Sequence, residues 1–482
     1  MLQTLKNAWN TKDIKSKILF TLLILLLYRV GTVIPVPFVE ANDFASTFSG
    51  TILDYMNVLS GGSLGAMTLF ALGVQPYINA SIIIQLLSVV FPKLAELAKD
   101  DKKKMSLITR IVTVVLALIT AIGYYFILLN SNALTKAATE GPAGWLYSIV
   151  IILCYCAGAS IIMWLAERIN DRGIGNGISM ILFANIVASV PSFVYNLVSL
   201  CAQTYGYTEN AWLYGIISTV FSIVFVVFLL ALIAVVIWFT GSERRIPVQY
   251  AKKVVGRKMY GGQSSNLPIK LNMTGVMPII FASSIVSFIP TILQVLQSAG
   301  VISEKETPGW YKFSEIIGAN GAIYPIALFL LIIGFAYFYT QITFDPIEVS
   351  NNLKRQGGAI PGIRQGRPTA DYIRKILNKI TLAGALFLGV IAVLPQILGP
   401  HVLKHFFAWI YEGMFVGTYY ETITMSGGMT FAQYYASMYA SNLVSIFSFG
   451  GTTLLIVVGV ALETFRQLEA ELTMRNYKGF LN

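Results

Sequence analysis

The sequence contains little charge for its length. Asp, Glu, Lys and Arg make up 12% of the 482 residues, whereas hydrophobic residues make up 56% and the mean hydropathy is +0.69. Soluble domains carry about a quarter charged residues. The composition therefore excludes a soluble globular protein and predicts a polytopic membrane protein.

Cysteine and histidine are scarce as well, with three and two residues. Cys154 and Cys156 lie in a hydrophobic run, where thiols act as small apolar groups, and together with Cys201 they show no metal-ligand or disulfide spacing. His401 and His405 have a spacing that suits a metal ion, but no clear third ligand accompanies them. The chain also lacks a nucleotide-binding motif. We therefore expect no metal, no cofactor, no catalytic residue and no energy source within the chain.

Long hydrophobic segments, by contrast, are abundant. A spanning helix needs about 20 mostly apolar residues, and ten segments meet this requirement. They lie near residues 18–34, 71–91, 107–129, 145–166, 178–200, 212–239, 273–297, 321–343, 376–398 and 449–467. No small-x-small cleavage site follows the first span, so we expect it to be retained.

The positive charges are distributed unevenly between the two sides that these spans define. With the N-terminus inside, 29 of the 34 Lys and Arg residues fall inside and four fall outside, while Arg29 lies near the outer end of the first span. Because Lys and Arg favour the cytoplasmic side, both termini are expected there. Five spans precede an external loop at 201–211 and five follow it. A repeat of five spans would be inverted, an arrangement that commonly places a conduit between the halves.

A short amphipathic segment stands between the first two spans. Phe48, Ile52, Met56 and Leu59 recur at helical spacing, and a Ser-Gly-Gly-Ser turn follows at 60–63. The segment is too short to cross a bilayer, so it either lies in the interface or re-enters between the helices. The residue pattern alone favours the interfacial position, because a re-entrant segment needs protein or water around it.

The second span carries an unusual polar stripe. Val74, Ile78, Ser81 and Gln85 share one face of the expected helix, with Ile82 beside them. Two interpretations stay open at this point. The stripe either joins neighbouring helices through polar contacts, or it faces a water-filled cavity that an apolar constriction closes.

Two cytoplasmic loops, 240–272 and 344–375, are longer than a connection requires. Both are basic, and the runs "RRIPVQY" and "RKMYGG" in the first predict projecting hairpins. Such arms suit RNA phosphate or an acidic protein surface, with contact to lipid headgroups as the alternative. The glycines of "ERINDRGIGNGIS", in contrast, predict a tight reversal between spans 4 and 5 rather than a phosphate site.

Five motifs occur in the order and topology typical of bacterial members of the SecY family, which form the channel subunit of the Sec protein translocon. They are "LSGGSLGAMTLFALGVQPYINASIIIQLL", "ERINDRGIGNGIS", "GVMPIIFASSI", "PGIR" and "FGGTTLLIVV". The resemblance covers nearly the whole chain. It implies an all-α protein of the bacterial inner membrane, with ten transmembrane helices in two inverted five-helix halves around an hourglass pore. It also implies a re-entrant plug helix at about residues 51–64, in place of the interfacial position.

The resemblance further implies functional residues, which we give here by their expected roles. The pore ring comprises Val74, Ile78, Leu182, Ile186, Ile280 and Ile456. The plug comprises Thr51, Ile52, Asp54, Met56, Asn57, Leu59, Ser60, Gly61 and Gly62. The lateral gate, between spans 2 and 7, comprises Ser81, Ile82, Gln85, Asn272, Ser283 and Ser284. The residues that bind a motor or a ribosome comprise Arg244, Arg245, Lys252, Lys253, Arg257, Lys354, Arg355 and Arg364.

The implied domain organisation is two halves, 18–200 and 212–467, with cytoplasmic segments 1–17 and 468–482. The implied partners are SecE, SecG, the SecA motor, the ribosome, signal peptides, preproteins and phospholipid. An external insertion at 399–448 departs from the family pattern, and its role is not implied.

Two other classes of protein compete with a channel. A structural membrane scaffold would leave the plug-like helix and the long basic loops without a role. A secondary transporter also uses inverted repeats, but coupled transporters generally hold ionisable groups near the bilayer midplane. Arg29 is the only charge well within a span, and it lies off-centre. We expect it to reach the interface or to cap neighbouring polar groups.

Overall fold

The computed structural model describes residues 2–40, 52–131, 133–135, 144–203, 211–250, 253–255, 258–260, 264–302, 307–318, 321, 323–398 and 451–478. Each predicted span contains a long helix. These helices are α2 (Lys12–Gly31), α4 (Gln75–Val90), α6 (Lys102–Asn130), α8 (Gly144–Arg172), α9 (Gly177–Gln203), α10 (Ala211–Gly241), α11 (Met277–Ser298), α13 (Ile323–Thr343), α15 (Arg367–Ile397) and α18 (Thr452–Lys478).

Seven helices in the described part of the chain are long and apolar enough to cross a membrane. Three of the ten helices do not meet this criterion. Helix α4 has only 16 residues, and α2 and α18 contain too many charged residues. Helix α4 begins at Gln75, four residues after the predicted start. Gly73 has a positive φ of 58°, and Pro76 occupies the first turn of the helix, where its missing amide is tolerated.

The turn between α8 and α9 confirms the predicted tight reversal. The Oδ1 of Asn170 accepts a hydrogen bond from the amide of Gly177 at 2.7 Å, and the Oδ1 of Asn176 accepts one from Ile178 at 3.1 Å. A Cβ on Gly177 would lie 2.0 Å from the carbonyl oxygen of Ala166. The backbone amides of this motif donate hydrogen bonds to side chains of the same turn. The motif therefore reverses the direction of the chain.

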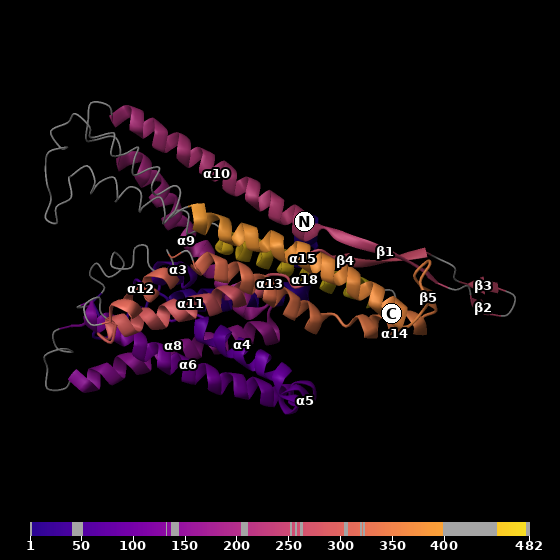
Figure 1. Cartoon of the computed structure of the whole chain (residues 1–482), viewed down its shortest axis with the longest axis horizontal. Coiled ribbons are helices and arrows are strands. Elements are labelled where there is room, and N and C mark those ends of the chain that lie inside the picture. Colours follow the sequence, from indigo (N-terminus) through magenta and orange to yellow (C-terminus); the bar gives the residue numbers. More distant parts are fainter. Residues whose placement is uncertain are drawn as a thin grey trace.

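A small antiparallel sheet projects beyond one end of the helices (Figure 1). It has the order β4-β1-β5, formed by β1 (Glu243–Tyr250), β4 (Ser264–Lys270) and β5 (Gly358–Ala359), and β2 (Lys253–Val255) pairs with β3 (Lys258–Tyr260). The predicted hairpins are thus confirmed. Because β1 pairs with β5, the two basic loops form one unit. Its apolar core includes Ile246, Val248 and Ile269 from the first loop and Leu353 and Ile360 from the second.

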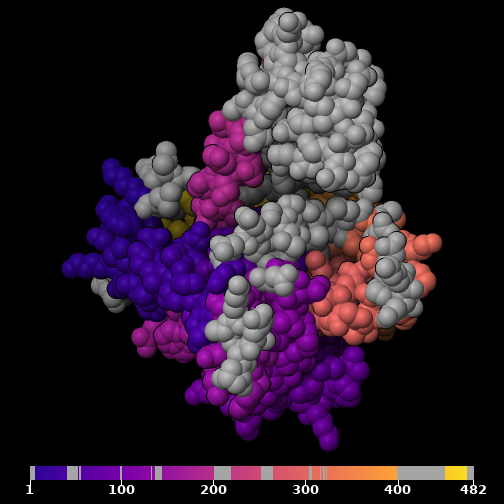
Figure 2. All heavy atoms as spheres, turned by 90° about the vertical axis from the view of Figure 1, so that its left-hand side faces the viewer, coloured from indigo at the N-terminus to yellow at the C-terminus, as the bar shows by residue number. Residues whose placement is uncertain are grey.

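Both ends of the described chain lie at the end of the molecule that carries the sheet. Helix α1 (Leu2–Asn10) packs on α18 and on the α8–α9 turn, through a cluster that includes Ala8, Ile174 and Leu468. Lys17 forms an ion pair of 2.9 Å with Glu471. Because both ends of the described chain lie at the same end of the molecule, the number of spans between them is even, as predicted. From the opposite end, the purple segments lie beside the salmon segments, which include α12 (Pro308–Ile317), and the indigo segments lie on the other side (Figure 2).

The remaining short helices are α3 (Ile52–Leu59), α5 (Pro92–Asp100) and α14 (Pro346–Arg355). Helix α3 packs against α9 and α11, inside the helical assembly, and the side chain of Leu53 is buried. The interfacial position that the residue pattern favoured is therefore wrong. The reason is that neighbouring helices supply polar partners for α3, which its own sequence does not reveal.

Candidate functional site

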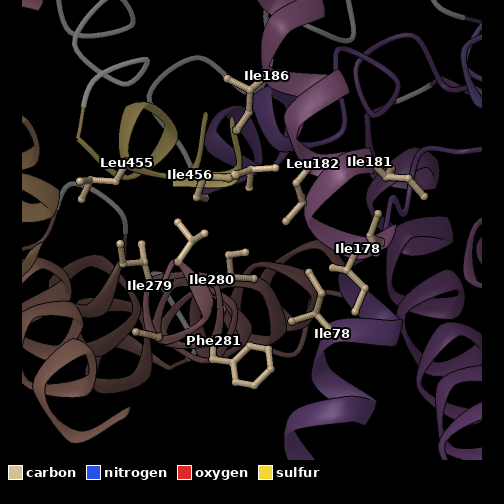
Figure 3. Close-up of a cluster of buried hydrophobic side chains, with 14 of the residues drawn as sticks. Ile78, Ile178, Ile181, Leu182, Ile186, Ile279, Ile280, Phe281, Leu455 and Ile456 are labelled. Carbon is tan, nitrogen blue, oxygen red and sulfur yellow. The ribbon is translucent and has the colours of Figure 1, made fainter. Parts of the chain in front are cut away.

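The six pore-ring residues meet in the largest cluster of buried apolar side chains. They come from the start of α4, from α9, from α11 and from α18, and none is more than 5% exposed. Ile78, Leu182, Ile280 and Ile456 face one another across a common space, whereas Phe281 points away from it (Figure 3). Four helices that are distant in sequence thus contribute to one aliphatic cluster, which we call the constriction.

The constriction joins the two halves of the chain by apolar contact. Its members Val74, Ile78, Leu182 and Ile186 precede the 201–211 loop, and Ile280 and Ile456 follow it. Aliphatic contacts have no preferred direction. Side chains of this kind can therefore separate and close again without a specific partner for each atom.

A cavity of about 280 Å³ lies beside the constriction. Five of the six ring residues line it, with Ile186 as the exception, and the rest of its wall comes mainly from α3, α6 and α11. The plug residues Met56, Leu59 and Ser60 belong to this wall. Helix α3 thus lies directly next to the constriction.

The described plug residues are held by contacts with two other helices. Thr291 of α11 donates to the Sδ of Met56 at 3.5 Å, and the Nδ2 of Asn185 on α9 donates to the carbonyl of Leu59 at 2.8 Å. The Oδ1 of Asn57 accepts from the amide of Gly65 at 2.9 Å, which closes the turn after α3. Thr51 lies outside the described residues, and Ile52 and Asp54 are placed only by their backbone within α3.

Five of the six lateral-gate residues lie on α4 and α11, which pack against each other, and Asn272 lies in the segment before α11, but their polar contacts differ from those expected. Ser283 donates to the carbonyl of Ile280 in its own helix. Ile82 is buried, Ser284 lines the cavity, and Asn272 is buried just before α11 with no hydrogen-bond partner for its Oδ1 among the described residues. These residues therefore form no polar bridge from α11 to α4 in the described part of the chain.

Two other hydrogen bonds cross this contact. The Nε2 of Gln75 on α4 donates to the hydroxyl of Ser287 on α11 at 2.9 Å. The hydroxyl of Tyr339 on α13 donates to the Oε1 of Gln85, whose Nε2 donates to Ser81 at 3.3 Å. Gln75 and Ser287 carry a signal in the sequence, since both are polar positions in apolar helices. Tyr339 carries none, because aromatic residues are common in this chain.

The basic residues of the two loops gather on the sheet and the segments that pack on it. Arg244 and Arg245 lie on β1, Lys354 and Arg355 end α14, and Arg364 lies between β5 and α15; all five are exposed. Lys253 is placed only by its backbone in β2, and Lys252 and Arg257 lie outside the described residues. The pairing of β1 with β5 brings these two loops, which are distant in the sequence, onto one basic surface.

The insertion at 399–448, with His401 and His405, lies outside the described residues. Within the described ranges, no group of three or more His, Cys, Asp or Glu side chains is arranged to hold a metal ion.

Comparisons with known proteins concern the family and the fold of the chain. The profile of the SecY family matches residues 68–465. The SecY subunit of the protein translocase of Streptomyces galbus is 38% identical over 497 residues and is covered completely, as is this chain. The same subunit of Mycobacterium tuberculosis is 38% identical over 496 residues, again with complete coverage of both chains.

Solved structures share the fold at low sequence identity. A protein-conducting channel superposes with a TM-score of 0.59 at 17% identity, covering 95% of this chain and 92% of that one. Sec61 from a canine ribosome–channel complex superposes with a TM-score of 0.56 at 16% identity and the same coverage. At such identities the likeness concerns the fold alone.

Proposed function

The chain belongs to the SecY family and forms a protein-conducting channel of a membrane, and we propose that its seal is the six-residue aliphatic constriction. The observation that carries this proposal is the meeting of Val74, Ile78, Leu182, Ile186, Ile280 and Ile456 beside α3. A narrow apolar constriction blocks ions because water leaves it. An unfolded polypeptide can still pass, since the aliphatic side chains pack against whatever fills the space.

Helix α3 and the turn after it, residues 51–64, act as the plug of the resting channel. Support comes from the position of Met56, Leu59 and Ser60 in the wall of the cavity next to the constriction. A translocating chain has to displace α3, because both occupy the same route. The segments 18–200 and 212–467 then act as two halves that separate around the passing chain.

The contact of α4 with α11 and α13 serves as the lateral gate. Its two hydrogen bonds, Gln75–Ser287 and Tyr339–Gln85, hold the gate closed by about 0.6–1.7 kcal/mol each, as measured for such bonds in membranes. A hydrophobic segment that enters the gate gains about 0.3–0.6 kcal/mol per Leu or Ile on reaching lipid, whereas a central charge costs about 2.5–3.5 kcal/mol. Signal sequences and membrane spans are thereby released sideways, and polar segments continue through the channel.

A partner supplies the energy, since the sequence contains no nucleotide-binding motif. The exposed basic surface around Arg364 suits an acidic protein surface or RNA phosphate, so we assign it to the SecA motor and to the ribosome. Ribosome-bound relatives such as canine Sec61 support the second partner. SecE and SecG are the membrane subunits that the family assignment adds.

We assign the chain to the bacterial inner membrane with both termini in the cytoplasm. The described termini and the basic sheet lie at one end of the molecule, and 29 of the 34 Lys and Arg residues belong to segments at that side. Positive residues favour the cytoplasmic side of a membrane.

Reconstitution into proteoliposomes tests the proposal. The full chain, purified with its membrane subunits, is expected to import a preprotein with a signal sequence only when the motor ATPase and ATP are added. A preprotein with a charge in the middle of its signal sequence is the matched control, and we expect it to stay outside. Uptake of a small solute without any partner would instead identify a secondary transporter.

A further inference from the structure

Arg29, the charge within the first span, lies over the turn that follows the plug helix. It belongs to the last turn of α2, and its Nη1 donates to the hydroxyl of Thr32 at 3.5 Å. A Cβ placed on Gly61 would lie 2.9 Å from the same Nη1 atom. The guanidinium group therefore lies close to Gly61, two residues after the C-terminal end of α3.

Asn185 holds the same end of α3 from the other side. Its side chain is completely buried, and its Nδ2 donates to the carbonyl of Leu59, the last residue of α3, at 2.8 Å. A Cβ on Gly61 would lie 3.0 Å from its Oδ1. Gly61 thus fits between Arg29 and Asn185, and no larger residue would fit without displacing one of them.

The buried Tyr28 completes this polar site. Its side chain is completely buried, and neither its hydroxyl nor the Oδ1 of Asn185 has a hydrogen-bond partner among the described residues. Buried polar atoms without aligned partners are costly.

We propose that Arg29 and Asn185 form a latch that holds the C-terminal end of the plug helix in the closed channel. The last carbonyl groups of a helix have no partner within the helix and carry partial negative charge. A cation and an amide donor placed there stabilise the seated helix. When a polypeptide displaces α3, both contacts break, so the latch sets how often the channel opens without a substrate. This inference rests on the plug role proposed above.

The experiment measures the resting conductance of the full channel complex in planar bilayers without any translocation partner. Asn185→Leu keeps the size of the side chain and removes the donor, so conductance is expected to rise about five- to tenfold, as for the loss of one buried hydrogen bond. Asn196→Leu is the matched control on the same helix. Asn196 is exposed and lies further along α9 than Asn185, away from the contact with Leu59. It should leave conductance at the level of the unmodified protein.

Gly61→Ala tests the latch from the plug side and does not depend on the folding of the Asn185 variant. Gly62→Ala serves for comparison, because Gly61 and Gly62 both have positive φ values, of 68° and 86°, but a Cβ on Gly62 meets no atom within 4 Å. The backbone strain is therefore shared, and only Gly61→Ala disturbs Arg29 and Asn185. We expect the larger rise in conductance from Gly61→Ala.

Three outcomes are distinguishable when Ile78→Gly combined with Ile280→Gly is measured in parallel. A rise in conductance for Asn185→Leu and Gly61→Ala, with motor-driven translocation retained, supports the latch. Unchanged conductance in both, while the ring variant leaks, overturns the latch and leaves the seal intact. Unchanged conductance in the ring variant as well overturns the proposed seal and the latch together.

Discussion

The constriction within the membrane and the basic sheet at the end of the molecule are built on opposite physical principles. The constriction consists of aliphatic side chains from four helices, without charge and with at most 5% exposure. The sheet has only a small apolar core and presents exposed guanidinium and ammonium groups. In the proposed function, one region excludes water and the other presents fixed charge to a partner.

This difference means that the two regions can be damaged separately. Apolar burial is non-directional, so the seal depends on volume and not on the identity of a partner. Charge recognition depends on sign and position, so the sheet depends on individual residues. Substitutions in the sheet should reduce partner-driven transport without leak, and substitutions in the constriction should cause leak without loss of partner binding.

Reversal of charge at the sheet is expected to have the largest effect. Arg364→Glu places a carboxylate on the exposed basic surface, and loss of a contact between charged partners costs about 2–5 kcal/mol. Motor-driven import of preprotein into proteoliposomes should therefore fall on the order of 30-fold or more, with unchanged resting conductance. Normal import by this variant would refute the role of Arg364. Co-purification of the membrane subunits checks that the variant assembles.

Removal of apolar volume from the constriction is expected to have the next largest effect. Ile78→Gly combined with Ile280→Gly removes side chains from both halves of the chain, and a decrease of about 1.4 kcal/mol in the barrier raises ion flow about tenfold. Planar-bilayer recordings of the resting channel measure this leak. Binding of the motor should not change, and a variant that leaks but also loses the motor would contradict the separation of the two regions.

A smaller effect is expected at the gate, where a hydrogen bond joins α13 to α4. Tyr339→Phe removes the hydroxyl that donates to Gln85, and such bonds contribute about 0.6–1.7 kcal/mol. At the average of about 0.6 kcal/mol, import of a preprotein with a weakened signal sequence should rise about threefold. Tyr337→Phe is the control, since the Tyr337 hydroxyl donates to the Asn378 carbonyl within the C-terminal half. Equal import by the two variants would exclude Tyr339 from the gate.

The smallest effect is expected for the ion pair between α2 and α18, at the end that carries the sheet. Lys17→Met breaks the 2.9 Å contact with Glu471, but the Lys17 side chain is 42% exposed, and exposed pairs contribute at most about 1 kcal/mol. Thermal unfolding in detergent should show a small decrease in stability that disappears at high salt. A large decrease would show that this contact, and not the constriction, holds the halves together.

Much of the fold could be predicted from local properties of the sequence. Hydropathy located all ten long helices, the proline and glycine pattern located the hairpins and the α8–α9 turn, and the family motifs placed six ring residues that the structure brings together. The start of α4 was misplaced by four residues, because Gly73 and Pro76 interrupt an otherwise apolar run.

The contacts between distant helices could not be predicted in the same way. The residue pattern favoured an interfacial α3, and the resemblance assigned the gate to spans 2 and 7, without Tyr339 of α13 or the Gln75–Ser287 pair. Gln85 and Tyr339 are 254 residues apart, and nothing near either residue specifies its partner.

The sequence by itself determined that this protein crosses a membrane ten times and displays its positive charge on one side. Transfer of a segment into lipid depends on the sum of its own side chains, and its orientation depends on the charges beside it. Only the tertiary structure decided that α3 packs against α9 and α11 and which polar groups cross the gate. Packing depends on contacts between residues of different helices, and these contacts form only when the helices assemble.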